Sequence, residues 1–223
     1  MDNFSAFDVI GPVMIGPSSS HTAGAVRIGN LAREIVDNKL KDVKVYFHGS
    51  FKETYQGHGT DKAIIGGLLG LKTDNSKIKD SFKLAAEAGF SFEFLAADLD
   101  DVHPNTMKLE ITDQNEVTTS IVASSIGGGN ILVTELNGTE VKLKGEYYTL
   151  ITFHNDQPGL IAKISEILQI YDLNIAEMEV LRKHKGSSAT AIINLDQEVK
   201  GHILKLLKDI PGINNLKLVK PLV

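Results

Sequence analysis

The last third of the chain shows the clearest strand and helix patterns. Residues 146–153 are rich in β-branched and aromatic side chains, which predicts a strand. The run LIAKISEILQIY, residues 160–171, repeats its apolar positions at helical spacing and predicts a helix. Further strands are predicted at 173–182, 189–195 and 213–219, and a second helix at 198–208. The order βαββαβ predicts a ferredoxin-like arrangement for residues 146–223.

The first two thirds of the chain mix helical and strand patterns. Residues 20–37 place apolar side chains on one helical face, and residues 61–71 predict a helix loosened by glycine. Strands are predicted at 43–47, 92–95, 107–112 and 116–123, with a hairpin about Asn137-Gly138. We therefore expect an α+β fold class with two domains, a mixed α/β domain at 1–144 and a βαββαβ domain at 146–223.

Composition and charge exclude several classes of protein. The 223 residues carry a net charge of −5, so a general attraction to nucleic acid or to an anionic membrane is not expected. The N-terminus lacks the basic segment of a secretory signal, and the longest apolar stretch, residues 63–71, is too short to span a bilayer. We expect a soluble cytoplasmic protein. The absence of cysteine excludes disulfides, thiolate nucleophiles and any cysteine-ligated iron–sulfur centre supplied by this chain itself.

The first polar cluster, GPSSSHTAG, lies at the predicted start of the 20–37 helix. Free N–H groups and the helix dipole at such a place favour an anion, for example a substrate carboxylate. The alternative interpretation is that Ser20 caps the helix and the other serines form a loop. The candidate residues are Ser18, Ser19, Ser20, His21 and Thr22.

The second polar cluster, GHGTDK, places His58 between two glycines. Small neighbours let a ligand approach the backbone closely, and histidine is the usual acid–base side chain near neutral pH. The alternative is a turn in which Thr60 or Asp61 caps the next helix.

Two further segments, HPNT (103–106) and SSIGGGN (124–130), combine polar side chains with turn-forming residues. The triple glycine predicts either a turn between two strands or a backbone cradle for a ligand. By residue type alone, His21, His58, Asp61 and His103 could hold a metal, but no pair has the i, i+4 spacing of zinc helices. A Ser–His–Asp hydrolase is also conceivable, although the G-x-S-x-G motif is absent.

The motifs SSSHTAGAVRIGN, GHGTDKA, HPNT and SSIGGGN, in this order, resemble the β chains of bacterial iron–sulfur L-serine dehydratases. The segment NDQPGLIAKI and the βαββαβ pattern resemble an ACT domain. Together the matches cover nearly the whole chain. One departure is the sequence ETYQ before GHGTD, where related chains tend to carry GTGK. The roles of the family's residues are therefore carried over less directly to the residues just before His58.

The resemblance implies a two-chain enzyme that acts on L-serine. An α chain would hold a 4Fe–4S cluster through its own cysteines, and this chain would complete the site without supplying a metal ligand. The reaction would be β-elimination of water to aminoacrylate, which hydrolyses to pyruvate and ammonia. Such a reaction needs a Lewis acid for the hydroxyl, a base for the α-proton and donors for the carboxylate.

The resemblance also assigns roles to residues. His58 would accept the α-proton, and His21 would support the opposite proton transfer or hold the carboxylate. Asp61 would orient its loop or contact the substrate ammonium, while Asn105 and Gly128 are secondary candidates. The residues implied to anchor the substrate are Ser18, Ser19, Ser20, Thr22 and Thr60.

For the ACT domain, the resemblance implies a small ligand near the first strand–helix loop and association of two copies through sheet edges. The residues are Asn155, Asp156, Pro158 and Gly159; alternatively, Asp156 only caps the helix. The N-terminal domain also resembles the allosteric substrate-binding domain of some phosphoglycerate dehydrogenases. A non-catalytic amino-acid sensor therefore remains the alternative function, and a small metal-dependent hydrolase is a third class.

Overall fold

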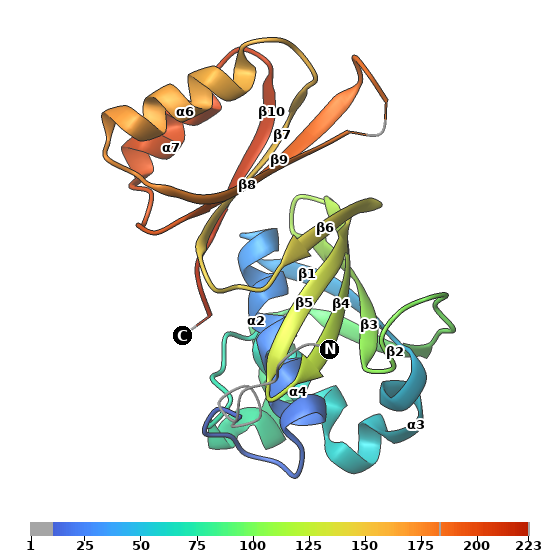
Figure 1. The fold of residues 1–223 in the computed structure, drawn as a ribbon. Coiled ribbons are helices and arrows are strands. Elements are labelled where there is room, and N and C mark those ends of the chain that lie inside the picture. Colours follow the sequence, from blue (N-terminus) through green and yellow to red (C-terminus); the bar gives the residue numbers. More distant parts are fainter. Residues whose placement is uncertain (1–10, 183, 223) are drawn as a thin grey trace, which may run out of the picture. The chain divides into compact units, whose positions relative to one another are not determined.

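The computed structural model describes residues 11–182 and 184–222 (Figure 1). They separate into two compact units, divided between Lys144 and Gly145. The first unit mixes helices with a sheet, and the second has the element order βαββαβ. The predicted fold class is therefore confirmed. None of the helices in the described ranges is long and apolar enough to cross a membrane.

A six-stranded sheet forms the centre of the first unit, in the order β2-β1-β3-β4-β5-β6. β1 and β2 run parallel, and the other neighbours are antiparallel. The predicted hairpin about Asn137-Gly138 is confirmed between β5 and β6. The strands are β1 (Leu40–Phe47), β2 (Ser91–Ala96), β3 (Thr106–Asp113), β4 (Thr118–Gly127), β5 (Asn130–Leu136) and β6 (Thr139–Leu143).

Helices of the first unit pack on the sheet and on one another. Two of them, α2 and α4, cross with their backbones in contact, because Gly29 and Gly67 face each other there; a Cβ on Gly67 would lie 2.1 Å from the Val26 carbonyl oxygen. The helical elements are η1 (a π-helical turn, Ser19–Ala23), α2 (Gly24–Val36), α3 (Gly49–His58), α4 (Thr60–Leu68), η2 (a 3₁₀ turn, Ser76–Asp80) and α5 (Ser81–Ala88).

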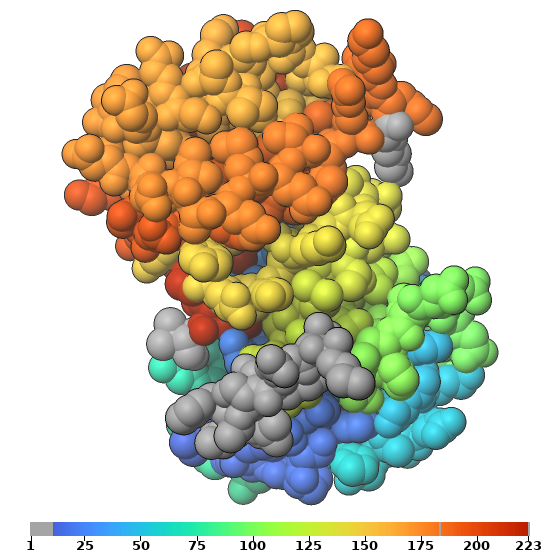
Figure 2. Space-filling model, viewed as in Figure 1, coloured from blue at the N-terminus to red at the C-terminus, as the bar shows by residue number. Residues whose placement is uncertain are grey.

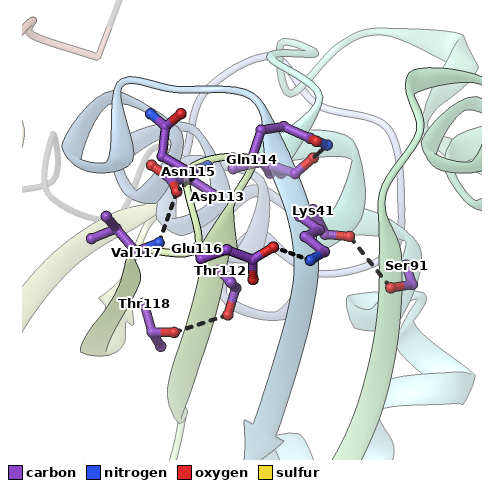
Figure 3. Close-up of polar contacts among 10 residues, drawn as sticks. Lys41, Ser91, Thr112, Asp113, Gln114, Asn115, Glu116, Val117 and Thr118 are labelled. Atoms are coloured by element: carbon purple, nitrogen blue, oxygen red, sulfur yellow. Dashed lines mark hydrogen bonds and ion pairs between the residues drawn. The ribbon is translucent and has the colours of Figure 1, made fainter.

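Figure 3 shows how the turn between β3 and β4 is held. Asp113 accepts hydrogen bonds from the backbone N–H groups of Asn115 and Val117 through its Oδ1 atom, at 2.8 and 2.9 Å. Lys41 of β1 forms an ion pair with Glu116, which has a positive φ of 61°. The turn is therefore fixed by side chains from two strands.

The second unit is a four-stranded antiparallel sheet in the order β10-β7-β9-β8 with two helices. Apolar side chains of both helices share one core with Leu150, Ile193 and Leu216 from the strands. β8 is an edge strand, and its orange atoms lie at the surface of this unit in Figure 2. The elements are β7 (Tyr148–Asn155), α6 (Leu160–Ile170), β8 (Ile175–Arg182), β9 (Ser188–Leu195), α7 (Gly201–Lys208) and β10 (Ile213–Val219).

Several details differ from the predicted elements. The sequence did not predict α3 or α5, because each buries few apolar side chains; Phe51 is the buried apolar residue of α3. The predicted 20–37 helix is divided into η1 and α2. β4 spans 118–127 rather than 116–123, since the side chain of Asp113 holds residues 115–117 in a turn.

Candidate active site

His21 is held by hydroxyl groups on both of its ring nitrogens. Ser18 is the N-cap of η1, and its Oγ accepts the backbone N–H of His21 at 3.1 Å. The same Oγ lies 3.3 Å from His21 Nδ1, and Ser50 Oγ lies 3.0 Å from His21 Nε2. The alternative interpretation, in which Ser20 caps the helix, is therefore wrong, because the helical turn begins at Ser19 and Ser18 caps it.

The π-helical turn that carries His21 is tightly packed. The N–H of Gly24 bonds to the carbonyl of Ser19, and a Cβ on Gly24 would lie 2.2 Å from Ser125 Oγ. The Thr22 hydroxyl donates to the His58 carbonyl at 3.2 Å. π-Helical turns occur often at functional sites, and this one joins the two histidine motifs.

His58 is the last residue of α3, and its ring centroid lies 4.7 Å from that of His21. Gly57 is helical, and Gly59 ends the helix with a φ of 66°. A Cβ added at Gly57 or at Gly59 would meet no atom within 4 Å. The structure thus leaves open space beside Gly57 and Gly59, the two sequence neighbours of His58.

Burial and charge act together on the titratable groups. Burial lowers the pKa of His21, the charge of His58 lowers it further, and a hydrogen bond with the Ser50 backbone acts in the opposite direction. Burial raises the pKa of Asp61, while hydrogen bonding from the Lys62 N–H counteracts it. His21 is therefore neutral at neutral pH, which is the form that can accept a proton or a hydrogen bond.

Three buried polar atoms around η1 have no hydrogen-bond partner within the part of the chain that the structure describes: His58 Nδ1, Thr60 Oγ1 and Ser125 Oγ. They lie on α3, α4 and β4, which all pack against η1. Buried polar groups are normally paired, so this concentration indicates a site that binds a polar ligand or water. Neither Thr60 nor Asp61 caps α4 through its side chain, so that alternative is wrong.

The other predicted residues lie in η1 itself or on segments joined to β4. The Asn105 carbonyl accepts the Ser125 N–H at 2.9 Å. Gly128 lies in the tight turn between β4 and β5, where Gly127, Gly128 and Gly129 all have positive φ. The triple glycine therefore forms a turn between the two strands. Ser19 and Ser20 are half-buried within η1.

Ser50, Phe51 and Ser125 belong to the site but were not predicted as functional residues. The Phe51 ring stands edge-on to His21, with centroids 5.2 Å apart. Ser50 and Phe51 lie on α3, which the apolar pattern did not reveal. Ser125 was visible in the SSIGGGN motif, and its neighbour Ser124 bonds to Thr106 instead.

In the second unit, Asp156 does not cap α6; the N-cap is Gly159, and the helix has no side-chain cap. Asp156 Oδ2 instead accepts the Gly186 N–H at 2.9 Å and pairs with Arg182 at 2.7 Å. These two contacts, the Gly186 N–H first, lower the pKa of Asp156. Asn155 accepts a hydrogen bond from Asn214, whereas Pro158 and Gly159 are exposed at the start of α6.

The donor atoms of this chain do not fit an iron–sulfur cluster. The sequence has no cysteine, and within residues 11–182 and 184–222 no group of three or more histidine or carboxylate side chains is placed to hold a metal ion. A cluster at this site would need thiolate ligands from another chain.

Comparison with known proteins gives consistent matches. The family model of the serine dehydratase beta chain matches residues 5–136, and that of the ACT domain matches residues 148–212. The chain is 47% identical to a probable L-serine dehydratase beta chain of Bacillus subtilis over 209 residues, which cover 94% of each protein. It is 40% identical to the L-serine dehydratase beta chain of Peptoniphilus asaccharolyticus, over 93% of this chain and 92% of the relative. It is also 26% identical to D-3-phosphoglycerate dehydrogenase of Bacillus subtilis, over 87% of this chain but 37% of that protein.

Proposed function

The chain belongs to the serine dehydratase beta chain family, and from that membership we propose that it is one half of a two-chain L-serine dehydratase. The enzyme removes water from L-serine to give aminoacrylate, which hydrolyses to pyruvate and ammonia. The pair of histidines on η1 and α3 is the observation that supports this chemistry in the chain itself.

His58 is the residue that we assign as the base. Both ring nitrogens of His21 lie within hydrogen-bond distance of serine hydroxyls, whereas His58 Nδ1 has no partner among the described residues. A neutral His58 ring takes the α-proton of serine as the C–H bond breaks. The electron pair forms the new double bond as the β-hydroxyl leaves, and that oxygen needs a proton or a Lewis acid to depart as water.

We propose that the N-terminal end of η1 and the residues around it bind the substrate. Free N–H groups and serine hydroxyls there suit a carboxylate. Thr60 and Asp61 begin α4 beside η1, so they can reach the same ligand, and a half-buried carboxylate at Asp61 suits a substrate ammonium. Thr22 acts through its hydrogen bond to the His58 carbonyl. The proposed anchoring residues are Ser18, Ser19, Ser20, Thr22, Thr60, Asp61, Asn105 and Gly128.

We place the iron–sulfur cluster on the partner, the α chain. The support is chemical, because this chain offers no thiolate and carries half of a site with open space beside His58. Residues 1–144 would then supply the acid–base half of the active site, and residues 146–223 would form a regulatory ACT domain.

We further propose that the ACT domain binds a small ligand at Asn155, Asp156, Pro158 and Gly159 and associates with a second copy. β8 has one neighbour in its sheet, and Val180 on it is 46% exposed. An edge strand pairs readily unless it is protected. Light scattering of the full chain, compared with Val180→Lys, tests this: the variant should shift the chain towards monomer, and an unchanged mass would contradict it.

The decisive experiment expresses this chain alone and together with a cysteine-rich α chain. We expect iron and pyruvate formation from L-serine in the co-expressed pair, and neither in the lone chain. Stoichiometric iron with turnover in the lone chain would overturn the division of roles. Serine binding by the full chain without turnover in any pairing would favour the sensor function.

A further inference from the structure

The backbone at Ser50, near the start of α3, is held in place by contacts with Pro104. Its N–H donates to the Pro104 carbonyl at 2.9 Å. The preceding residue, Gly49, has a φ of 52°, and a Cβ there would lie 2.5 Å from the same carbonyl oxygen. The HPNT segment, whose role the sequence left open, therefore fixes the first turn of α3 and with it the position of Ser50.

The hydrogen bonds around His21 favour one tautomer. Ser18 Oγ already accepts the backbone N–H of His21. A second N–H from Nδ1 of the same residue would converge on that oxygen, whereas the hydroxyl proton of Ser18 can be donated to an unprotonated Nδ1. The ring proton then lies on Nε2 and is donated to Ser50 Oγ, 3.0 Å away.

From this geometry we propose that Ser50 is a positioning residue that holds His21 as the neutral Nε2–H tautomer and so leaves His58 as the single base of the pair. The catalytic part of this inference rests on the proposed dehydratase function, but the tautomer does not. Ser50 touches no reacting atom in the proposed reaction; it acts through His21.

The tautomer can be measured in the full chain by ¹⁵N NMR of its histidines, with His21 assigned by the signals lost in His21→Gln. We expect the wild-type ring to carry its proton on Nε2. Ser50→Ala should move His21 towards a mixture of tautomers, and Ser50→Thr, which keeps a hydroxyl, should restore the wild-type signals. A proton on Nδ1 in the wild type would overturn the proposal even if Ser50→Ala does not fold.

Thr54→Val is the matched control. Thr54 lies one turn further along α3, and its hydroxyl donates to the Ser50 carbonyl at 2.7 Å rather than to the Ser50 hydroxyl. This variant removes a hydroxyl from the same helix and should leave the His21 tautomer unchanged. If Thr54→Val changes the signals as much as Ser50→Ala does, the effect belongs to the helix and the proposal is wrong.

In the co-expressed enzyme, Ser50→Ala should lower kcat on the order of tenfold, the effect of one hydrogen bond, with a smaller change in KM, and Ser50→Thr should recover most of it. Full activity of Ser50→Ala, or a change in KM alone, would contradict the positioning role. If no variant and no wild-type pairing turns over serine, the proposed function fails, while the NMR result still decides the tautomer.

Discussion

At the scale of single residues, the two imidazole rings, whose centroids are 4.7 Å apart, cannot both be positively charged without mutual repulsion. Burial lowers the pKa of His21 further, so the neutral form of that ring is stabilised. In the proposed reaction, a proton removed from the substrate would be accommodated on one ring while the other stays neutral. The proposal therefore gives the two rings different roles.

His58→Ala should lower turnover of the co-expressed enzyme by about 10²–10⁴-fold, the usual contribution of a general base. Exchange of the α-deuteron of labelled serine into water measures the proton transfer directly and should be lost with it. His21→Ala should weaken apparent serine affinity as well as turnover.

Iron content and subunit association provide the control for these histidine variants, and both should match the wild type. If His58→Ala exchanges the α-deuteron at near wild-type rates, the proton acceptor lies elsewhere, and this chain supplies substrate anchoring alone.

Gly57→Ala tests whether the open space beside His58 is used. A Cβ at Gly57 meets no atom within 4 Å, and the residue is exposed and helical. Replacing glycine by alanine in such a helix should therefore raise the free energy of unfolding by about 0.5–1 kcal/mol. We expect lower activity despite this gain, because substrate or the partner chain would occupy the space. Urea unfolding and the rate of pyruvate formation are the two measurements; unchanged activity would show that the space is not used.

At the scale of secondary-structure elements, the site depends on how α2 and α4 cross. η1 continues into α2, and α4 begins directly after His58 and Gly59, so this crossing sets the distance between the two histidine motifs. The backbones touch because Gly29 and Gly67 lack side chains at the contact. Packing of a helix pair therefore positions the two histidine motifs, to which we assign the acid–base roles.

Gly67→Ala should separate the two helices. Its Cβ would lie 2.1 Å from the Val26 carbonyl oxygen, a backbone atom that cannot move independently of α2. Overpacking of this kind typically costs about 1–3 kcal/mol, and the displacement should lower activity as well. Gly57→Ala is the matched control, since it adds the same methyl group to a helix without a clash. Equal unfolding free energies for the two variants in urea would refute the importance of the crossing.

The sequence predicted some elements and missed others for physical reasons. The second unit was predictable, because the run from Leu160 onward and its flanking strands bury regular apolar patterns. α3 was not predictable, because Phe51 is its buried apolar residue and its stability comes from contacts with residues distant in sequence, such as Pro104. The two histidines and the motifs around them could be identified from the sequence. The contact of His21 with Ser50 could not, because it depends on the unpredicted helix α3.

At the scale of the whole molecule, each of the two units contains a histidine whose pKa is lowered by burial. In the first unit this is His21, and in the second it is His154, which is 2% exposed and lies on β7 with its Nδ1 3.1 Å from Thr152 Oγ1. Contacts with Thr152 and the charge of Asp156 act in the opposite direction at His154. Folding therefore favours neutral histidine in both units.

The stability of the chain should therefore fall as the pH drops below the ordinary histidine pKa of about 6.5. Below that value His21 and His154 bind protons in the unfolded chain but stay neutral in the folded chain. Proton binding therefore stabilises the unfolded state relative to the folded state, and the free energy of unfolding falls. Urea unfolding at pH 5.5, 6.5 and 7.5 measures the effect above the range in which carboxylates titrate. The double variant His21→Gln/His154→Gln should show a flatter pH profile because it removes both groups. A double-variant profile as steep as that of the wild type would show that the acid sensitivity comes from other groups, whereas wild-type stability that rises towards pH 5.5 would contradict neutral burial of the two histidines.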